Sequence, residues 1–160
     1  KISKKNSSSK LFGLDISTEL LNIANNRKIS NAEFYNYKVS DKLPRVLNKF
    51  LDSSPKKIIK IATLIGVLQN CGSNPENFLK SIISHYPYDF FFITTKVSFN
   101  ENKDFEKLKY SVFLISELFE LFYNLKMKVQ YFAPLYSKFL SKPNESNSFN
   151  GLFVLKNNFK

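Results

Sequence analysis

LFGLDIS, residues 11–17, is the stretch that decides the fold of this chain. It is a short apolar run, typical of a buried β-strand, and it ends on the single carboxylate of Asp15. A helix N-cap is offered directly afterwards by Ser17 or Thr18. Such a strand delivers its carboxylate to the carboxyl edge of a sheet, where an acid can accept hydrogen bonds from both hydroxyls of a ribose. Asp15 is therefore the first candidate for a binding residue.

Strand and helix patterns alternate along the rest of the chain. Strands are predicted over residues 10–16, 32–39, 57–66, 88–95, 128–136 and 150–156. Helices are predicted from Ser17 or Thr18 to Asn26, over 41–51, and from Asn74 and Ser116 onward. The apolar run at 58–65 is typical of a strand that is buried on both faces of a parallel sheet.

The last two strands differ from the others. Their connection, residues 137–149, has no helical period and contains Pro143, which indicates an antiparallel hairpin with a long loop. The pattern as a whole predicts an α/β fold with a mostly parallel sheet, helices on both faces and a carboxyl-terminal antiparallel hairpin.

Length and composition favour one domain over residues 10–160, preceded by a polar leader at 1–9 that we expect to be poorly packed. No apolar run approaches the ~18 residues of a membrane span, and the start has no apolar signal core. We therefore expect a soluble, cytoplasmic protein. The single cysteine, Cys71, excludes an internal disulfide, and with one histidine we expect no metal site.

The net charge of +11 raises the question of nucleic-acid binding. Only two of the basic residues, Arg27 and Arg45, are arginines, the residue favoured for bidentate phosphate and base recognition. The lysines are spread along the whole chain. A solvated basic surface is the favoured interpretation, and RNA binding stays open as a minor alternative.

The chain resembles the S-adenosylmethionine-dependent methyltransferases of the Rossmann-like class. Residues 12–17, followed by Leu20-Leu21 and Ala24, resemble that family's second strand and helix, which carry a "GxDxS" phrase and then "LxxA". Residues 64–69 resemble the "VLQ" end of its fourth strand, and 74–79 the helix start that follows. A branch with a "VLQY…dP" phrase, linked to surface-polysaccharide biosynthesis, is the most similar variant.

The resemblance implies a set of binding residues for S-adenosylmethionine. Asp15 would bind the ribose hydroxyls and Ile16 would lie against the adenine, which Val39 would flank from the end of the third strand. Ile65 and Gly66 would border the methionine moiety. The implied activity is methyl transfer to a small molecule or glycan.

Gln69 and Thr95 are placed by the pattern where they could orient the substrate, and no residue stands out as catalytic. The sulfonium already makes the methyl group electrophilic, so alignment of the nucleophile supplies most of the catalysis.

Three features depart from the family's pattern. Its first strand and glycine-rich loop should precede residue 10, where this sequence has only the polar leader, so the fold is expected to be truncated at its amino-terminal side. Either the chain is a fragment of a longer protein or it cannot hold the cofactor in the usual way. Lys38 occupies the place where many members have an acid that bonds the adenine amine. Lys126 stands where a glycine commonly precedes the sixth strand.

Other interpretations of the same residues stay open. Asp15 could be an ordinary strand-end or helix-capping acid, and Gln69 a loop residue that bonds backbone. The whole chain could be a Rossmann-like binding or interaction module without catalysis. The sequence gives no information on the oligomeric state.

Overall fold

The computed structural model describes residues 9–37, 59–71, 74–85, 88–101, 111–135 and 148–158. The chain divides into two compact units, Lys1–Lys57 and Ile58–Lys160, and each is described by itself. The helix predicted over 41–51 and the candidate Val39 lie outside the described residues.

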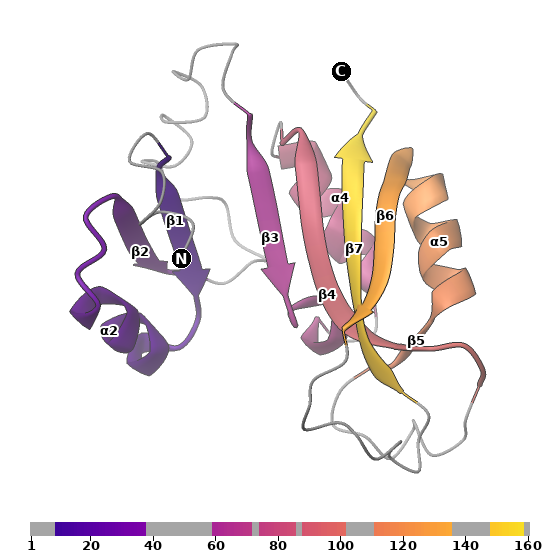
Figure 1. Cartoon of the computed structure of the whole chain (residues 1–160), viewed down its shortest axis with the longest axis horizontal. Helices are drawn as coiled ribbons and strands as arrows, with labels where there is room; N and C mark the ends of the chain where they lie inside the picture. Colours follow the sequence, from indigo (N-terminus) through magenta and orange to yellow (C-terminus); the bar gives the residue numbers. More distant parts are fainter. Residues whose placement is uncertain are drawn as a thin grey trace. The chain divides into compact units, whose positions relative to one another are not determined.

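The first unit contains β1 (Leu11–Asp15), α2 (Thr18–Asn26) and β2 (Ala32–Asn36), shown in Figure 1. The two strands are parallel, in a register that pairs Leu11 with Ala32 and Asp15 with Asn36. The helix begins after Ser17, whose Oγ accepts a hydrogen bond from the N–H of Leu20 at 3.2 Å. The strand–helix–strand order, the Ser17 cap and the helix end at Asn26 are confirmed.

The second unit contains the remaining elements. In chain order they are β3 (Ile61–Ile65), the 3-10 turn η1 (Leu68–Asn70), α4 (Pro75–His85), β4 (Phe90–Ser98), β5 (Phe113–Leu114), α5 (Ile115–Asn124), β6 (Met127–Leu135) and β7 (Phe149–Asn157). Figure 1 shows β7 between β4 and β6, and the sheet order is β3-β4-β7-β6, with β5 paired to β4. β3, β4 and β5 are parallel, whereas β7 runs antiparallel to both β4 and β6. The α/β fold with its antiparallel carboxyl-terminal pair is thus confirmed.

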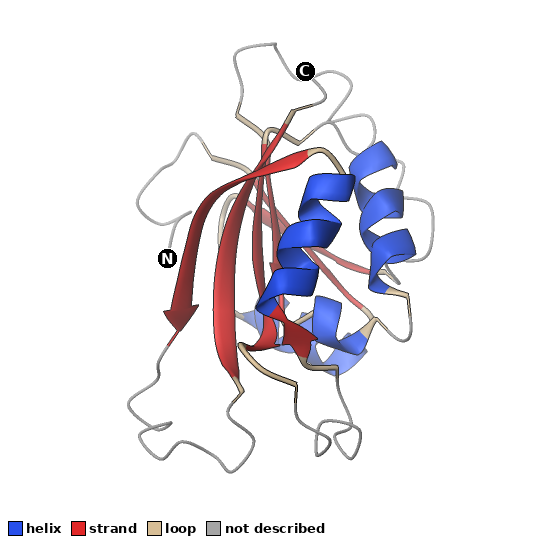
Figure 2. Ribbon diagram, turned by 90° about the vertical axis from the view of Figure 1, so that its right-hand side faces the viewer, coloured by secondary structure: helices blue, strands red, loops and turns tan. Residues whose placement is uncertain are grey.

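The two described helices of the second unit, α4 and α5, lie on the same side of its sheet (Figure 2). Several strand residues on that side are completely buried, among them Phe91, Ile93 and Phe153 at 0% exposure. The ring of Phe153 packs edge-on against Phe122 of α5, with 5.3 Å between centroids. Full burial of such aromatic side chains is the main stabilising contribution to this core.

The opposite side of the same sheet is more open. Ile61 and Ile65 of β3 are 51% and 75% exposed, and Tyr131 of β6 is 55% exposed. The expectation that 58–65 would be buried on both faces is therefore wrong for the part of the chain that the structure describes. The reason is that β3 pairs with β4 alone and both described helices of this unit lie on the other face.

Three local features were not predicted. The loop at 67–72 contains η1, β4 continues to Ser98 beyond the predicted end at residue 95, and β5 is a two-residue strand before α5. Of the described helices, none is long and apolar enough to cross a membrane.

Candidate functional site

Asp15 is the last residue of β1 and is partly exposed. One carboxylate oxygen, Oδ1, accepts a hydrogen bond from the N–H of Ser17 at 2.8 Å, and the backbone carbonyl accepts one from Tyr37 at 2.8 Å. No described residue bonds to the second carboxylate oxygen. Since Ser17 rather than Asp15 caps α2, this carboxylate is held in a fixed turn with one oxygen available to a ligand.

Ile16 follows Asp15 directly and is 69% exposed. Its backbone carbonyl accepts a hydrogen bond from the side-chain amide of Asn36 at 3.0 Å, which links the carboxyl ends of β1 and β2. The exposed Ile16 side chain offers an apolar surface to a ligand. The neighbouring Asp15 carboxylate offers a polar anchor to the same ligand.

A second candidate surface is at the carboxyl end of β3. Gly66 has a φ of 65°, a backbone conformation that is unfavourable for residues with a side chain. A β-carbon built at Gly66 would meet nothing within 4 Å. Its N–H donates to the carbonyl of Thr94 at 2.9 Å and to the Thr94 hydroxyl at 3.1 Å. The side-chain amide of Asn70 donates to the Gly66 carbonyl at 2.8 Å. The turn is thus fixed while the space over Gly66 stays open, next to the exposed Ile65.

Gln69 lies in η1 and is bonded to backbone on two sides. Its side-chain Oε1 accepts a hydrogen bond from the N–H of Lys96 at 3.0 Å, and its main-chain carbonyl accepts one from Ser111 at 2.9 Å. This geometry fits the interpretation of Gln69 as a loop residue that bonds backbone, because its side-chain oxygen already accepts a hydrogen bond. The role of Gln69 toward a substrate stays a prediction.

Thr95 lies on the face of β4 that α4 and α5 cover. It is 1% exposed, and its hydroxyl has no hydrogen-bond partner among the described residues. Its neighbour Thr94 points to the other face and bonds to Gly66. Thr94 and Asn70 are therefore residues of the Gly66 turn that the sequence interpretation missed. Alternation of buried and exposed positions along β4 would separate Thr94 from Thr95. In the sequence the strand begins with a continuous apolar run, which does not show which positions belong to which face.

The sequence-predicted residues are distributed over the chain. Asp15 and Ile16 belong to the first unit, and Ile65, Gly66, Gln69 and Thr95 to the second. Val39 lies outside the described residues.

Cys71 is partly buried, and its Sγ–H donates to the carbonyl of Leu68 at 2.8 Å. Burial raises the pKa of the Cys71 thiol above its ordinary value of 9.0, so it is protonated at neutral pH and a poor nucleophile. Within the described ranges, no group of three or more His, Cys, Asp or Glu side chains could hold a metal ion.

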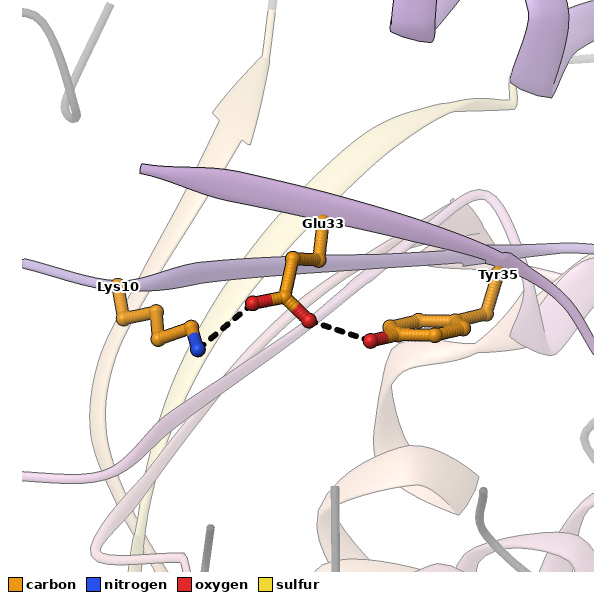
Figure 3. A network of polar contacts seen from close by, with 3 residues as sticks. All are labelled: Lys10, Glu33 and Tyr35. Atoms are coloured by element: carbon orange, nitrogen blue, oxygen red, sulfur yellow. Dashed lines mark hydrogen bonds and ion pairs between the residues drawn. The ribbon is translucent and has the colours of Figure 1, made fainter. Parts of the chain in front are cut away.

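A polar network of three side chains lies on the surface of the first unit. Figure 3 shows the Glu33 carboxylate between Lys10 and Tyr35: it forms an ion pair with the Lys10 ammonium at 2.6 Å and accepts a hydrogen bond from the Tyr35 hydroxyl. The bond to Lys10, and then the one to Tyr35, lower the pKa of Glu33 below its usual 4.5, and the carboxylate raises the pKa of Tyr35 above 10.0. These groups are partly exposed, so the network orders the surface of the strand pair without forming a closed site.

No family model and no curated protein matches the sequence of the chain. Solved structures do match its fold. The [4+2]-cyclase SpnF superimposes with a TM-score of 0.68 and 11% identity, over 97% of this chain and 68% of its own. The O-methyltransferase from a Brevibacillus brevis trans-AT PKS multienzyme, in complex with S-adenosyl-L-homocysteine, superimposes with a TM-score of 0.67 and 14% identity. The match covers 97% of this chain and 61% of that protein.

The magnesium protoporphyrin IX methyltransferase of Synechocystis PCC 6803, with bound SAM, gives a TM-score of 0.61 and 8% identity, over 94% of this chain and 60% of its own. The chain has the methyltransferase fold. It spans 60 to 68% of the length of these three proteins. Since one of them is named a cyclase, the fold alone leaves the reaction open.

Proposed function

We propose that this chain is an S-adenosylmethionine-dependent methyltransferase or the carboxyl-terminal part of one. The observation that carries the proposal is the carboxyl end of β1, where Asp15 has one oxygen anchored by the Ser17 N–H and the other without a described partner, beside the exposed Ile16. A carboxylate at this edge suits the two hydroxyls of a ribose, and an exposed isoleucine suits the flat apolar face of an adenine.

In this proposal each residue has one role. Asp15 accepts hydrogen bonds from the ribose hydroxyls, Ile16 packs on the adenine, and Val39, which the resemblance assigns to the end of the third strand, flanks the adenine. Ile65 and Gly66 border the methionine moiety, for which the open space at Gly66 is suited because backbone can approach a ligand closely there.

The bound cofactor would supply an electrophilic methyl group, and this chain's residues would bind and align. The acceptor we propose is a small molecule, with a glycan suggested by the resemblance to the polysaccharide-linked branch. Gln69 and Thr95 are the proposed substrate residues. For Gln69 the free group is its amide nitrogen, since the side-chain oxygen accepts from Lys96. For Thr95 a substrate contact would require its buried hydroxyl to become accessible.

The proposal is tested by methyl NMR of isoleucine-labelled protein, translated from the complete gene and titrated with S-adenosylhomocysteine. The δ1 methyl signals of Ile16 and Ile65 should shift, because both side chains are exposed at the proposed contacts, whereas that of Ile82, 5% exposed in α4, should stay in place. Unchanged Ile16 and Ile65 signals at saturating ligand would contradict the proposal.

A second candidate is a non-catalytic binding module. The fold match to a protein named a cyclase shows that a chain of this fold need not transfer a methyl group, and the module is the alternative in which this chain binds a ligand and catalyses no reaction. The two are distinguished by incubating the complete protein with S-adenosylmethionine and an extract of small molecules and glycans. Formation of S-adenosylhomocysteine above the protein-free rate supports methyl transfer, and binding without turnover supports the module.

A further inference from the structure

Asn36 is the last residue of β2, and its side chain is fixed by the turn that follows β1. Its amide nitrogen, Nδ2, donates to the Ile16 carbonyl at 3.0 Å and to the Thr18 hydroxyl at 3.4 Å. A carbonyl oxygen only accepts hydrogen bonds, so the Ile16 contact determines which end of the Asn36 amide is the nitrogen. The other end, Oδ1, is a hydrogen-bond acceptor to which no described residue donates.

Asn36 and Asp15 lie side by side at the carboxyl end of the strand pair. They are register partners, and the N–H of Tyr37 donates to the Asp15 carbonyl at 2.8 Å, which joins the two strand ends. Both side chains reach the same turn: that of Asp15 bonds to the N–H of Ser17, and that of Asn36 to the carbonyl of Ile16. Neighbouring strands lie about 4.8 Å apart, so the second Asp15 oxygen and Asn36 Oδ1 form a pair of neighbouring acceptors.

A ribose presents two hydroxyls on neighbouring carbons, and each hydroxyl has one proton to donate. One oxygen of the Asp15 carboxylate already accepts from the Ser17 N–H, so a single Asp15 oxygen is without a described partner. Two neighbouring donors are best matched by two neighbouring acceptors, because both O–H···O bonds can then be short and straight. Asn36 supplies the second acceptor, and it adds no second negative charge beside the carboxylate.

We infer that Oδ1 of Asn36 accepts a hydrogen bond from one ribose hydroxyl of the bound nucleoside, while Asp15 accepts from the other. Asn36 thereby selects ribose over deoxyribose, since a site that bonds a hydroxyl discriminates against a ligand that lacks it. The discrimination is modest at an exposed position, because water replaces the lost bond. The inference rests on the proposed function, to which it adds a ligand residue outside the set that the resemblance implies.

The test is calorimetric titration of the complete protein with S-adenosylhomocysteine and with its 2′-deoxy and 3′-deoxy analogues. Asn36→Leu should weaken the binding of S-adenosylhomocysteine about 3- to 10-fold, which corresponds to one neutral hydrogen bond. The same variant should bind one of the two deoxy analogues as tightly as the wild type does, namely the analogue without the hydroxyl that Asn36 accepts from. Asn22→Leu, the matched substitution at an exposed asparagine of α2, should bind all three ligands like the wild type.

Asn36 also supports the turn at Ile16, and the three ligands separate that structural role from contact with the ribose. An equal loss of affinity for all three ligands in Asn36→Leu, or no loss for any of them, would overturn the inference while the proposed function stands. Failure of the wild type to bind S-adenosylhomocysteine would overturn both. Asn36→Ala serves as a second variant if the leucine variant does not fold, and it should show the same pattern of affinities.

Discussion

The ring of Phe34 in β2 lies directly over Gly13 in β1, its register partner. A β-carbon at Gly13 would lie 2.8 Å from Cε1 of that ring and closer still to Cδ1. The glycine of the 11–17 stretch is therefore required by close packing within the strand pair.

Gly13→Ala should destabilise the first unit by about 1–3 kcal/mol, because the ring must move to accommodate the methyl group. Phe34→Leu should relieve the clash, so the double variant should lose less stability than the two single variants together. Urea unfolding of the four proteins measures this, and a Gly13→Ala variant as stable as the wild type would refute the packing argument.

Lys126 follows Leu125, the C-cap of α5, and has a φ of 55°, in the left-handed region that favours glycine. Lys126→Gly should thus raise the free energy of unfolding by about 0.5–1 kcal/mol. Lys128→Gly in β6 is the matched control and should lower it, because a strand residue gains nothing from that freedom. Thermal unfolding of both variants decides the sign, and destabilisation by Lys126→Gly would show that its side-chain contacts outweigh the backbone strain.

Thr95 and Thr94 give opposite predictions for the same substitution. Thr95→Val replaces a buried hydroxyl that has no partner among the described residues, so stability should rise by about 1 kcal/mol. Thr94→Val removes the hydroxyl, one of the two acceptors of the Gly66 N–H, and should lower stability by about 0.5–1 kcal/mol. Chemical denaturation separates the two, and loss of stability in Thr95→Val would reveal a partner for its hydroxyl.

The Glu33 network predicts a pH dependence at both ends of the scale. Because Lys10 and Tyr35 lower the pKa of Glu33, the stabilisation from its carboxylate is present above 4.5 and is lost as the pH falls through the lowered pKa. Because the carboxylate raises the pKa of Tyr35, that contribution is present below 10.0 and is lost as the pH rises through the raised value.

Side-chain NMR titration of wild type and Lys10→Met tests this directly. The pKa of Glu33 should move up toward its ordinary value in the variant, and Tyr35→Phe should move it in the same direction by less. An unchanged Glu33 pKa in Lys10→Met would show that the ion pair does not persist in solution.

Local signals in the sequence predicted most elements of the fold. The Ser17 cap and the Asn26 end of α2 depend on neighbouring residues only, and the structure has both. The one-sided burial of β3 could not be predicted, because the nearly continuous apolar run at 58–65 is typical of a strand with both faces covered, whereas the described helices of the second unit cover only one face (Figure 2). Sequence alternation also could not separate Thr94 from Thr95, since the preceding phenylalanines are apolar on both faces.

For the candidate site, sequence order identified Asp15 and Gly66 as the ends of strands; in the structure Asp15 is the last residue of β1 and Gly66 directly follows β3. The hydrogen bond between Gln69 and Lys96 joins residues 27 positions apart, which no local pattern encodes. Val39 and the ligand roles of all these residues stay predictions.

The central claim is that Asp15 binds the ribose of S-adenosylmethionine, and calorimetric titration of the complete protein with S-adenosylhomocysteine tests it most directly. Asp15→Asn keeps an oxygen for the Ser17 N–H but loses the charge, so affinity should fall about 10- to 100-fold. Glu19→Gln, at an exposed position in the first turn of α2, should bind like the wild type. Equal affinity of Asp15→Asn and wild type, or no binding by the wild type, would contradict the claim.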